Sequence, residues 1–260
     1  MERVLVLRLE ASECVAEAWL NGFPLVRANP LARNAALQVN EFVLEGDNRL
    51  ALGLRPDAKA AGAAPRLAFS AAGARVQLLL GRPGRVASDA TSRVLAEFAV
   101  AVAEGEMFPS EPVEHRFDLP VKFPRWRWQD APAADPIADY ARVTDFAQRM
   151  AVALFRGESE SFILASRVRL EELAVAYQMR ASEIADRMRS RLQLLHATKA
   201  LRPVMPVLGE MQVRPCGGGR LLECLVGEEP ALRTAPDGEG VQHAWPMRVA
   251  VIEGHCHVFR

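Results

Sequence analysis

The stretch PVKFPRWRWQDAPAADP, residues 120–136, separates two parts of the chain that differ in their sequence patterns. It holds Pro120, Pro124, Pro132 and Pro136, out of 17 prolines in the chain, and also Trp126 and Trp128. Proline cannot donate a backbone hydrogen bond and keeps the residue before it out of the helical region. The stretch is therefore predicted to be neither one long helix nor a central strand, but a stiff connector between two domains.

The patterns on the two sides of this connector predict different folds. Before it the chain reads as eight or nine short strands separated by turn signals, which is typical of an antiparallel sandwich of jelly-roll type. After it come helices and then strands, which predicts helices packed on a curved antiparallel sheet. We therefore expect a two-domain α+β protein with a β-sandwich at residues 1–119, a linker at 120–134 and an α+β domain at 135–260.

Tryptophan and arginine alternate inside the connector. In an extended segment, Trp126 and Trp128 would share one face, and Arg125 and Arg127 the other. One hypothesis is that the indoles are buried between the two domains and hold them in a fixed arrangement. The alternatives are an exposed binding hot spot, for which Trp and Arg are the favoured residues, and a base-stacking platform. These four residues are the first candidate binding residues.

Composition and charge exclude several classes of function. The chain has 260 residues, a formal net charge of +0 and a pI near 7.0, which is against a dedicated nucleic-acid binder. No apolar run approaches the roughly 18 to 20 residues of a membrane helix. The first apolar run is interrupted by Arg8 and Glu10, unlike a signal peptide. We expect a cytoplasmic protein without a membrane or nucleic-acid partner.

The cysteines and histidines do not predict a metal site. No CxxC pair occurs among Cys14, Cys216, Cys224 and Cys256, so buried free thiols are expected. On a strand, His255 and His257 would share a face, with Cys256 on the other. No third ligand is apparent unless folding recruits His243 or Glu223. We therefore predict no metal and no cofactor.

Turn signals define the elements of the first domain. Residues 2–9 predict a strand, and Asn21-Gly22 predicts a tight hairpin, because a type I′ turn needs positive φ at both central positions. A turn is expected at residues 45–48 and a further hairpin turn at 71–74. Loops are predicted at residues 57–65 and 81–92, and the last two strands at 97–107 and 113–119.

Two parts of this region resemble the jelly-roll sugar-binding modules attached to glycosidases. Those modules share an "LNG" hairpin and a later "LxxGxNxL" strand–turn–strand, which match Leu20-Asn21-Gly22 and then Leu44, Gly46, Asn48 and Leu50. The resemblance implies a fold rather than a ligand, because Asn21, Gly22, Gly46 and Asn48 belong to turns. A sugar site would need exposed aromatic residues on one sheet face, where the region offers mainly Trp19 and Phe23.

The second domain is predicted from helix caps and glycines. Asp135-Pro136 is expected to begin a helix that Gly157 ends, a second helical region has a break near Ser166, and Ser182 can cap a third helix. Strands are expected at residues 209–216, 219–227, 230–234, 244–254 and 255–260. The glycines at 217–219 and the pair Glu253-Gly254 predict hairpin turns.

This order of helices and strands resembles the cone-shaped fold of the nuclear-transport-factor-two and polyketide-cyclase superfamily. The tail also resembles that family's Gly-x-x-x-Val-x-Arg ending through Gly254, Val258 and Arg260. The resemblance implies a cavity between helices and sheet. Polar groups that could project into it are Tyr140, Asp145, Tyr177, Glu223, His243 and Arg248.

Three functional hypotheses remain. No phosphate-binding loop, dinucleotide fingerprint, nucleophile elbow or zinc-protease motif occurs in the sequence. The leading hypothesis is a non-catalytic bacterial interaction protein, such as an immunity or adaptor protein that neutralises a toxin, with another protein as partner and a homodimer as an open alternative. The others are a small-molecule binder or enzyme using the cone cavity, with Tyr140, Tyr177 and Arg248 as binding residues, and a carbohydrate-binding module.

Overall fold

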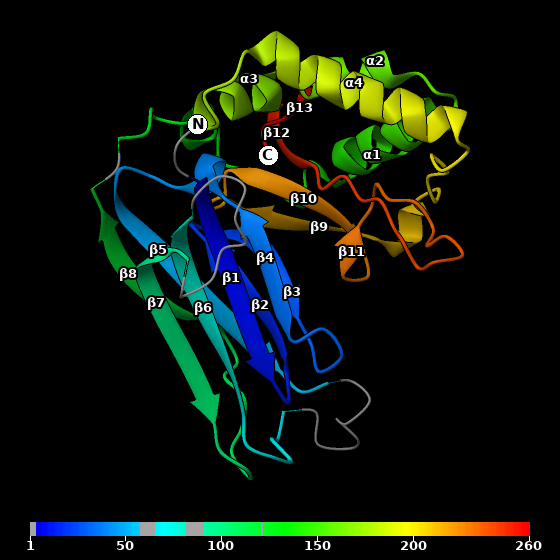
Figure 1. Ribbon diagram of the computed structural model, residues 1–260. Helices are drawn as coiled ribbons and strands as arrows, with labels where there is room; N and C mark the ends of the chain where they lie inside the picture. Colours follow the sequence, from blue (N-terminus) through cyan, green and yellow to red (C-terminus); the bar gives the residue numbers. More distant parts are fainter. Residues whose placement is uncertain (1–3, 58–65, 82–90, 121) are drawn as a thin grey trace. The chain divides into compact units, whose positions relative to one another are not determined.

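The computed structural model describes residues 4–57, 66–81, 91–120 and 122–260. The chain divides into two compact units, residues 1–125 and 126–260, and each is described by itself. Within the described residues the protein is a mixed α+β protein with antiparallel sheets, as expected (Figure 1). The α-helices of the described residues lie in the second unit.

The described part of the first unit forms two four-stranded antiparallel sheets. One sheet has the order β4-β1-β6-β7 and the other β3-β2-β5-β8 (Figure 1). The strands of the first sheet are β1 Val4–Ser12, β4 Asn34–Gln38, β6 Ala72–Gly81 and β7 Arg93–Val102. Those of the second are β2 Val15–Leu20, β3 Phe23–Ala28, β5 Gly46–Arg55 and β8 Val113–Leu119. A 3-10 turn, η1, spans Asn40–Phe42.

Alternating apolar residues place the core of this unit between its two sheets. Successive side chains of a strand point to opposite faces, so each strand can bury every second residue. The inward residues are almost fully buried, for example Leu7, Leu9, Leu50, Leu52 and Leu78. Contacts of β1 with β3 and of β5 with β6 join the sheets face to face. Burial of these side chains, at about 25 cal/mol per Å² of apolar area, is the main stabilisation of the unit.

The predicted Asn21-Gly22 hairpin is confirmed. Both residues have positive φ, 52° and 78°, and Leu20 pairs directly with Phe23 across the turn. Asn21 also stabilises its surroundings, because its side-chain nitrogen donates to the Phe42 carbonyl at 2.8 Å. The asparagine is buried and thus fixes the turn against η1.

Asn48 completes this buried network from inside β5, because that strand already begins at Gly46, and the position predicted for the turn, residues 45–48, is therefore wrong. Its side-chain oxygen accepts hydrogen bonds from the Asn21 side chain at 2.8 Å and from the Leu44 backbone at 2.9 Å. Its nitrogen donates to the Leu44 and Gly46 carbonyls. Because polar groups without partners are costly inside a protein, these bonds specify the path of residues 44–48.

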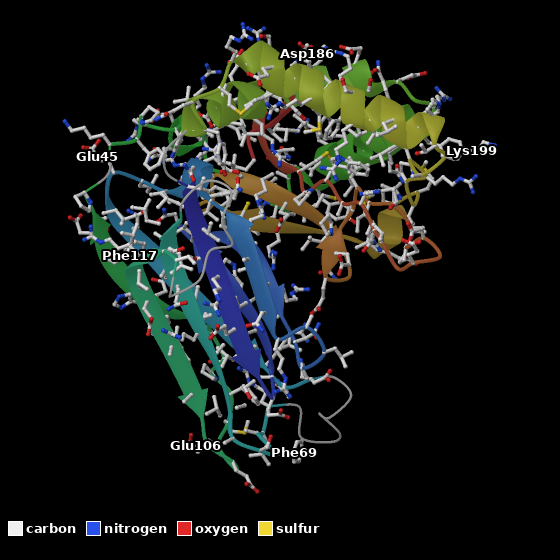
Figure 2. The ribbon with its side chains drawn as sticks, in the orientation of Figure 1. Glu45, Phe69, Glu106, Phe117, Asp186 and Lys199 are labelled. Atoms are coloured by element: carbon white, nitrogen blue, oxygen red, sulfur yellow. The ribbon has the colours of Figure 1, made fainter. Side chains whose placement is uncertain are left out.

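The hairpin predicted at residues 71–74 is wrong. Strand β6 already begins at Ala72, and the preceding segment pairs instead with the β7–β8 connection. The Ala68 amide donates to the Glu106 carbonyl and the Phe108 amide to the Arg66 carbonyl, both at 2.8 Å. Figure 2 shows Phe69 and Glu106 together at one end of the sandwich. The small residues at 71–74 allowed a turn, but long-range pairing decides the conformation. The loops predicted at 57–65 and 81–92 lie mostly outside the described residues.

The second unit contains four helices and one antiparallel sheet in the described residues. The helices are α1 Tyr140–Phe155, α2 Ser159–Ala165, α3 Arg167–Ala176 and α4 Ala181–Ala197. The strands are β9 Met211–Cys216, β10 Leu221–Val226, β11 Glu229–Pro230, β12 Arg248–Ile252 and β13 His255–Val258. Short 3-10 turns are η2 Arg127–Asp130 and η3 Leu208–Glu210. The strand order of the sheet is β11-β10-β12-β13, and β9 also pairs with β10.

Some of the helix boundaries predicted from local sequence signals in this unit are confirmed. Gly157, at φ 79°, follows the end of α1, and Ser166 separates α2 from α3, as predicted. Helix α1 begins at Tyr140 and not at Pro136, because the Asp135 carboxylate caps a separate turn by accepting the amides of Ile137 and Ala138 at 2.9 Å.

Two further expectations in the second unit are corrected. Ser182 lies inside the first turn of α4, whose N-cap is Arg180. The strand expected at residues 230–234 is wrong, because β11 already ends at Pro230, and Arg233 and Thr234 form isolated bridges to Ala244 and Pro203, respectively. None of the helices in the part of the chain that the structure describes combines the length and apolar character needed to cross a bilayer.

Candidate functional site

The space between α1 and the sheet is filled by apolar side chains. The inward face of α1 packs against β9, β10 and β13, and α2 and α4 extend the same cluster. Members of this cluster are Val143, Phe146, Met150, Leu154, Phe162, Leu192, Leu222, Cys224, Trp245 and Val249. The described residues thus form a packed core at the place where the cone resemblance implies a cavity.

The polar residues expected around that cavity are not brought together. Asp145 is 63% exposed and pairs with Arg149 on the surface of α1. The Tyr140 hydroxyl donates to backbone carbonyls at Leu208, 2.8 Å away, and Met211, at 3.0 Å. Tyr177 is the partly buried C-cap of α3. His243 lies beside Trp245, with 6.3 Å between ring centroids.

Glu223 and Arg248 lie on the sheet face opposite the core, because their neighbours Leu222 and Cys224 point into it. The Glu223 carboxylate is buried between two guanidiniums, those of Arg214 at 2.8 Å and Arg248 at 3.1 Å. The three residues stand opposite one another on β9, β10 and β12. The carboxylate is therefore paired with two guanidiniums, and we assign it a structural role.

The tryptophans of the connector are buried, so the exposed aromatic patch is not formed. Trp126 is 1% exposed and Trp128 is 5% exposed, whereas Arg125 and Arg127 are exposed. The guanidinium of Arg260 lies over the Trp126 ring, 5.2 Å from its centroid, and pairs with the carboxylate of Glu172. These contacts belong to the second unit. The hypothesis that the indoles also fix the two domains stays a prediction.

Helix α3 anchors the connector through two adjacent carboxylates. The Arg127 amide donates to Glu172 at 2.6 Å, and its guanidinium donates to Glu171 at 2.7 Å. The guanidinium of Arg167 also contacts Glu171, so hydrogen bonds from Arg167 and then Arg127 lower the pKa of that carboxyl. Trp126 and Arg127 of the connector thus make their described contacts with α3 and with Arg260, inside the second unit.

The thiols and histidines do not form a reactive or metal-binding cluster in the described residues. His255 is exposed, and His257 and Cys256 are partly buried. The four cysteines are free thiols. Burial raises the pKa of Cys216 and of Cys224 to about 12. Thiols with such pKa values stay protonated at neutral pH and are weak nucleophiles.

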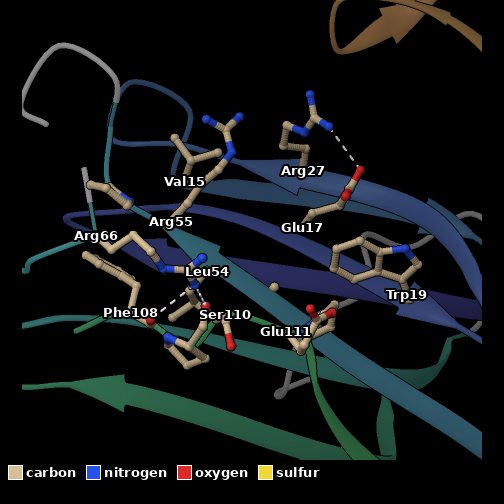
Figure 3. A pocket seen from close by; sticks show the side chains of 14 residues that line it. Val15, Glu17, Trp19, Arg27, Leu54, Arg55, Arg66, Phe108, Ser110 and Glu111 are labelled. Atoms are coloured by element: carbon tan, nitrogen blue, oxygen red, sulfur yellow. Dashed lines mark hydrogen bonds and ion pairs between the residues drawn. The ribbon is translucent and has the colours of Figure 1, made fainter. Parts of the chain in front are cut away.

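A pocket of about 320 Å³ lies on the outer face of the sheet β3-β2-β5-β8 (Figure 3). Strands β2, β3 and β5 supply its floor and one side, and residues 108–112 supply the opposite wall. Its side chains combine aromatic rings, prolines and charges. The charged and aromatic members are Glu17, Trp19, Arg27, Arg55, Arg66, Phe108 and Glu111.

Trp19 gives the pocket an aromatic surface because the facing strand has a glycine. The six-membered ring of the indole covers Gly53, where an added Cβ would lie 2.8 Å from two ring carbons. Gly53 stands opposite Glu17 in the ladder, and Ala51 stands opposite Trp19, so the ring leans diagonally across β5. The indole is only partly buried, which leaves part of its surface available to a ligand.

The polar groups of the pocket are held in fixed positions. Glu17 and Arg27 face each other across β2 and β3 and form an ion pair at 3.0 Å (Figure 3). The Arg66 guanidinium donates to the Phe108 carbonyl at 3.2 Å and also to the Pro109 carbonyl. The pairing of residues 66–68 with 105–108 thus brings Arg66 into the pocket wall.

Sequence reasoning named Trp19 and Phe23 as the aromatic residues of this region, and only Trp19 lines the pocket. Phe23 is fully buried and packs against Phe42, with 5.2 Å between ring centroids. The remaining pocket residues were missed. Glu17 and Trp19 alternate outward beside a predicted hairpin, and a glycine inside a strand often marks a close approach, so Gly53 was the signal available.

Comparisons of the chain with protein-family models, curated proteins and solved structures found no match.

Proposed function

We propose that the protein is a non-catalytic binding protein whose first unit holds a carbohydrate in the pocket beside Trp19. The observation that carries this proposal is the partly exposed indole fixed over Gly53 inside a pocket of about 320 Å³. The C–H groups on one face of a sugar ring can pack on an aromatic surface, and the hydroxyls at its edge need polar partners. Ligand sites combine these two elements in the same way.

The charged residues of the pocket suit hydroxyl groups better than an apolar ligand. Glu17 and Glu111 offer carboxylate oxygens as acceptors, and Arg27 and Arg66 offer guanidinium donors. A hydroxyl both donates and accepts, so it can bond to either kind of group. An apolar ligand would remove these groups from water without replacing their hydrogen bonds, which is costly.

A glycan array with the purified protein tests this proposal. We expect binding to at least one oligosaccharide, loss of that binding in Trp19→Ala, and retention in Phe69→Ala. Phe69 is a suitable control because it is an aromatic residue of the same unit, 54% exposed and outside the pocket. Absence of binding to any glycan, or equal binding by Trp19→Ala and the native protein, would refute the proposal.

A protein partner is the second candidate, since the helices of the second unit expose large apolar side chains. Leu164 is 73% exposed, Leu194 63% and Val175 55%. A groove of about 280 Å³ also lies among α2, α3 and α4. This surface supports the interaction role, such as toxin neutralisation, that the sequence favours. Copurification with the product of a neighbouring gene, and its loss in Leu164→Glu but not in Leu31→Glu, would support it; Leu31 is an exposed leucine of the first unit.

The finer fold and location assignments belong to the same proposal. The paired four-stranded sheets and the Asn21–Asn48 network are consistent with a jelly-roll type of sandwich. Among the described residues, four helices followed by one antiparallel sheet are consistent with a cone-like second domain. The four free thiols fit the cytoplasmic location that the sequence predicts. Circular permutants or a crystal structure test the first two, and cell fractionation tests the last.

A further inference from the structure

We infer that Glu111 determines the specificity of the Trp19 pocket by selecting a neutral sugar ring with two free hydroxyls on adjacent carbons. This inference rests on the proposed function and narrows its ligand class. Three observations carry it: the place of Glu111 at the indole end of the pocket, the constrained wall to which it belongs, and the exposure of its carboxylate.

Glu111 lines the pocket at the end that holds Trp19. A Cβ added to Gly53 would lie 2.8 Å from the indole and 3.8 Å from Cγ of Pro112, the residue that follows Glu111. The indole and the wall formed by residues 108–112 therefore meet over the same glycine of β5. Figure 3 shows Glu111 near Trp19 at this end. A sugar ring packed on the exposed part of the indole can thus reach the Glu111 carboxylate with its edge.

The wall that carries Glu111 is constrained on both sides of this residue. The Arg66 guanidinium donates to the Phe108 and Pro109 carbonyls, and the Phe108 amide donates to the Arg66 carbonyl at 2.8 Å. On the other side, the ring of Pro112 disfavours the helical conformation for the backbone of Glu111. A side chain on a constrained backbone loses less conformational freedom on binding, so more of its interaction free energy appears as affinity.

The carboxylate of Glu111 differs from that of Glu17, which also lines the pocket. The Glu17 carboxylate is paired with Arg27 at 3.0 Å, and its side chain is only 17% exposed. Glu111 is exposed, and among the residues that the structure describes it has no ion pair or hydrogen bond. Both oxygens of Glu111 are therefore open to a ligand.

The two oxygens of one carboxylate favour a pair of hydroxyls as partners. An ionised carboxylate only accepts hydrogen bonds, and its two oxygens can accept from two donors at once. Two hydroxyls on adjacent carbons of a sugar ring, unless both are axial, lie close enough together to donate to both oxygens. A ring with one hydroxyl at this edge would make one such bond, and a ring with a carboxylate there would be repelled. Glu111 thus favours a neutral ring with adjacent free hydroxyls.

Neutral oligosaccharides that differ only in linkage test this inference. Internal rings of a 1→4-linked chain have free hydroxyls on the adjacent carbons C2 and C3, whereas those of a 1→3-linked chain have them on C2 and C4, which are not adjacent. The probes are β-linked oligomers of glucose, galactose and xylose in both linkages, attached to a surface through the reducing end and O-methylated on the terminal ring. Because hydrogen bonds to a charged group are strong, the 1→4-linked member of a pair should bind about tenfold more tightly in biolayer interferometry.

A substitution of the same shape tests the residue itself. Glu111→Gln should weaken binding of the 1→4-linked member about tenfold and remove its advantage, because an uncharged amide has one acceptor oxygen in place of two. Glu104→Gln should retain the preference. Glu104 is a suitable control because it is an exposed glutamate of the same unit outside the pocket.

The outcomes separate this inference from the proposed function. Equal or tighter binding of the 1→3-linked members would refute the adjacent hydroxyls and leave a carbohydrate site intact. A preference for the 1→4-linked members that persists in Glu111→Gln would also refute the inference, because another group would then recognise the hydroxyls. Binding on the glycan array without binding to any of these oligomers would refute the inference alone. Absence of binding in both experiments would refute the proposed function as well.

Discussion

Trp19 and Trp126 differ in exposure, although charged residues lie near both indoles. Trp126 is 1% exposed and lies under the guanidinium of Arg260, which forms an ion pair with Glu172. Trp19 lies over Gly53 and keeps part of its ring at the surface of a pocket. The residues adjacent in sequence do not explain this difference in exposure. Trp126 has more arginines beside it in the sequence than Trp19, and yet it is the more buried indole. The difference lies in the residue that packs against each ring. The Arg260 side chain covers the Trp126 ring, whereas Gly53 contacts the Trp19 ring and has no side chain that could cover it.

The largest effect is expected from truncating the connector tryptophans. Trp126→Ala and Trp128→Ala should each lower the free energy of unfolding by about 3 kcal/mol, because the loss of a buried aromatic ring leaves a cavity. Denaturant unfolding followed by circular dichroism measures this. Trp19→Ala, which removes a partly exposed ring, should cost clearly less. If Trp19→Ala proves the more destabilising, the contrast between the two regions is wrong.

A somewhat smaller effect is expected at Asn48, which supports the turn region next to the Trp19 strand. Asn48→Ala removes the acceptor for the Asn21 side chain and the Leu44 amide. Leaving buried donors without partners should cost about 2 kcal/mol in denaturant unfolding. Asn29→Ala is the control, because Asn29 bonds only to exposed loop amides at residues 31 and 32. Equal costs for both variants would contradict the role given to the network.

Gly53→Ala should affect the pocket more than the fold. The new Cβ would lie 2.8 Å from the indole of Trp19, so the ring must move. We expect a stability cost of about 1 kcal/mol from overpacking and a clear loss of glycan binding. Gly209→Ala is the control, because a Cβ there has no neighbour within 4 Å. Unchanged binding by Gly53→Ala would show that the position of the indole is not important.

The smallest effect is expected in the pH dependence of stability, through the ion pair that joins the connector to α3. Hydrogen bonds from Arg167 and Arg127 lower the pKa of Glu171 in the folded protein. Its contribution to stability is therefore present above the unfolded-state pKa and is lost as the pH falls through the lowered folded-state value. Glu171→Gln should weaken the decline of the melting temperature in acid by a small amount. A steeper decline in the variant would contradict this sign.

Local residue preferences were sufficient to predict several turns and the order of strand-rich and helical regions. Asn21-Gly22, Gly157 and Glu253-Gly254 have the positive φ that their turns or helix end require, and that preference is a property of the residues themselves. Period-two patterns likewise identified the inward faces of strands such as β5, because alternation follows from backbone geometry.

Other features depend on contacts with residues far away in the sequence. Residues 71–74 could turn, yet β6 starts at Ala72 because the preceding segment pairs with residues 105–108. Burial was one hypothesis for Trp126, and Trp19 was named for a sugar site, but the residues packed against the two indoles, Arg260 and Gly53, lie far along the chain from them. Arg66 reaches the pocket only through that same long-range pairing. Such contacts depend on which segments meet after folding, and a local preference contains no information about that.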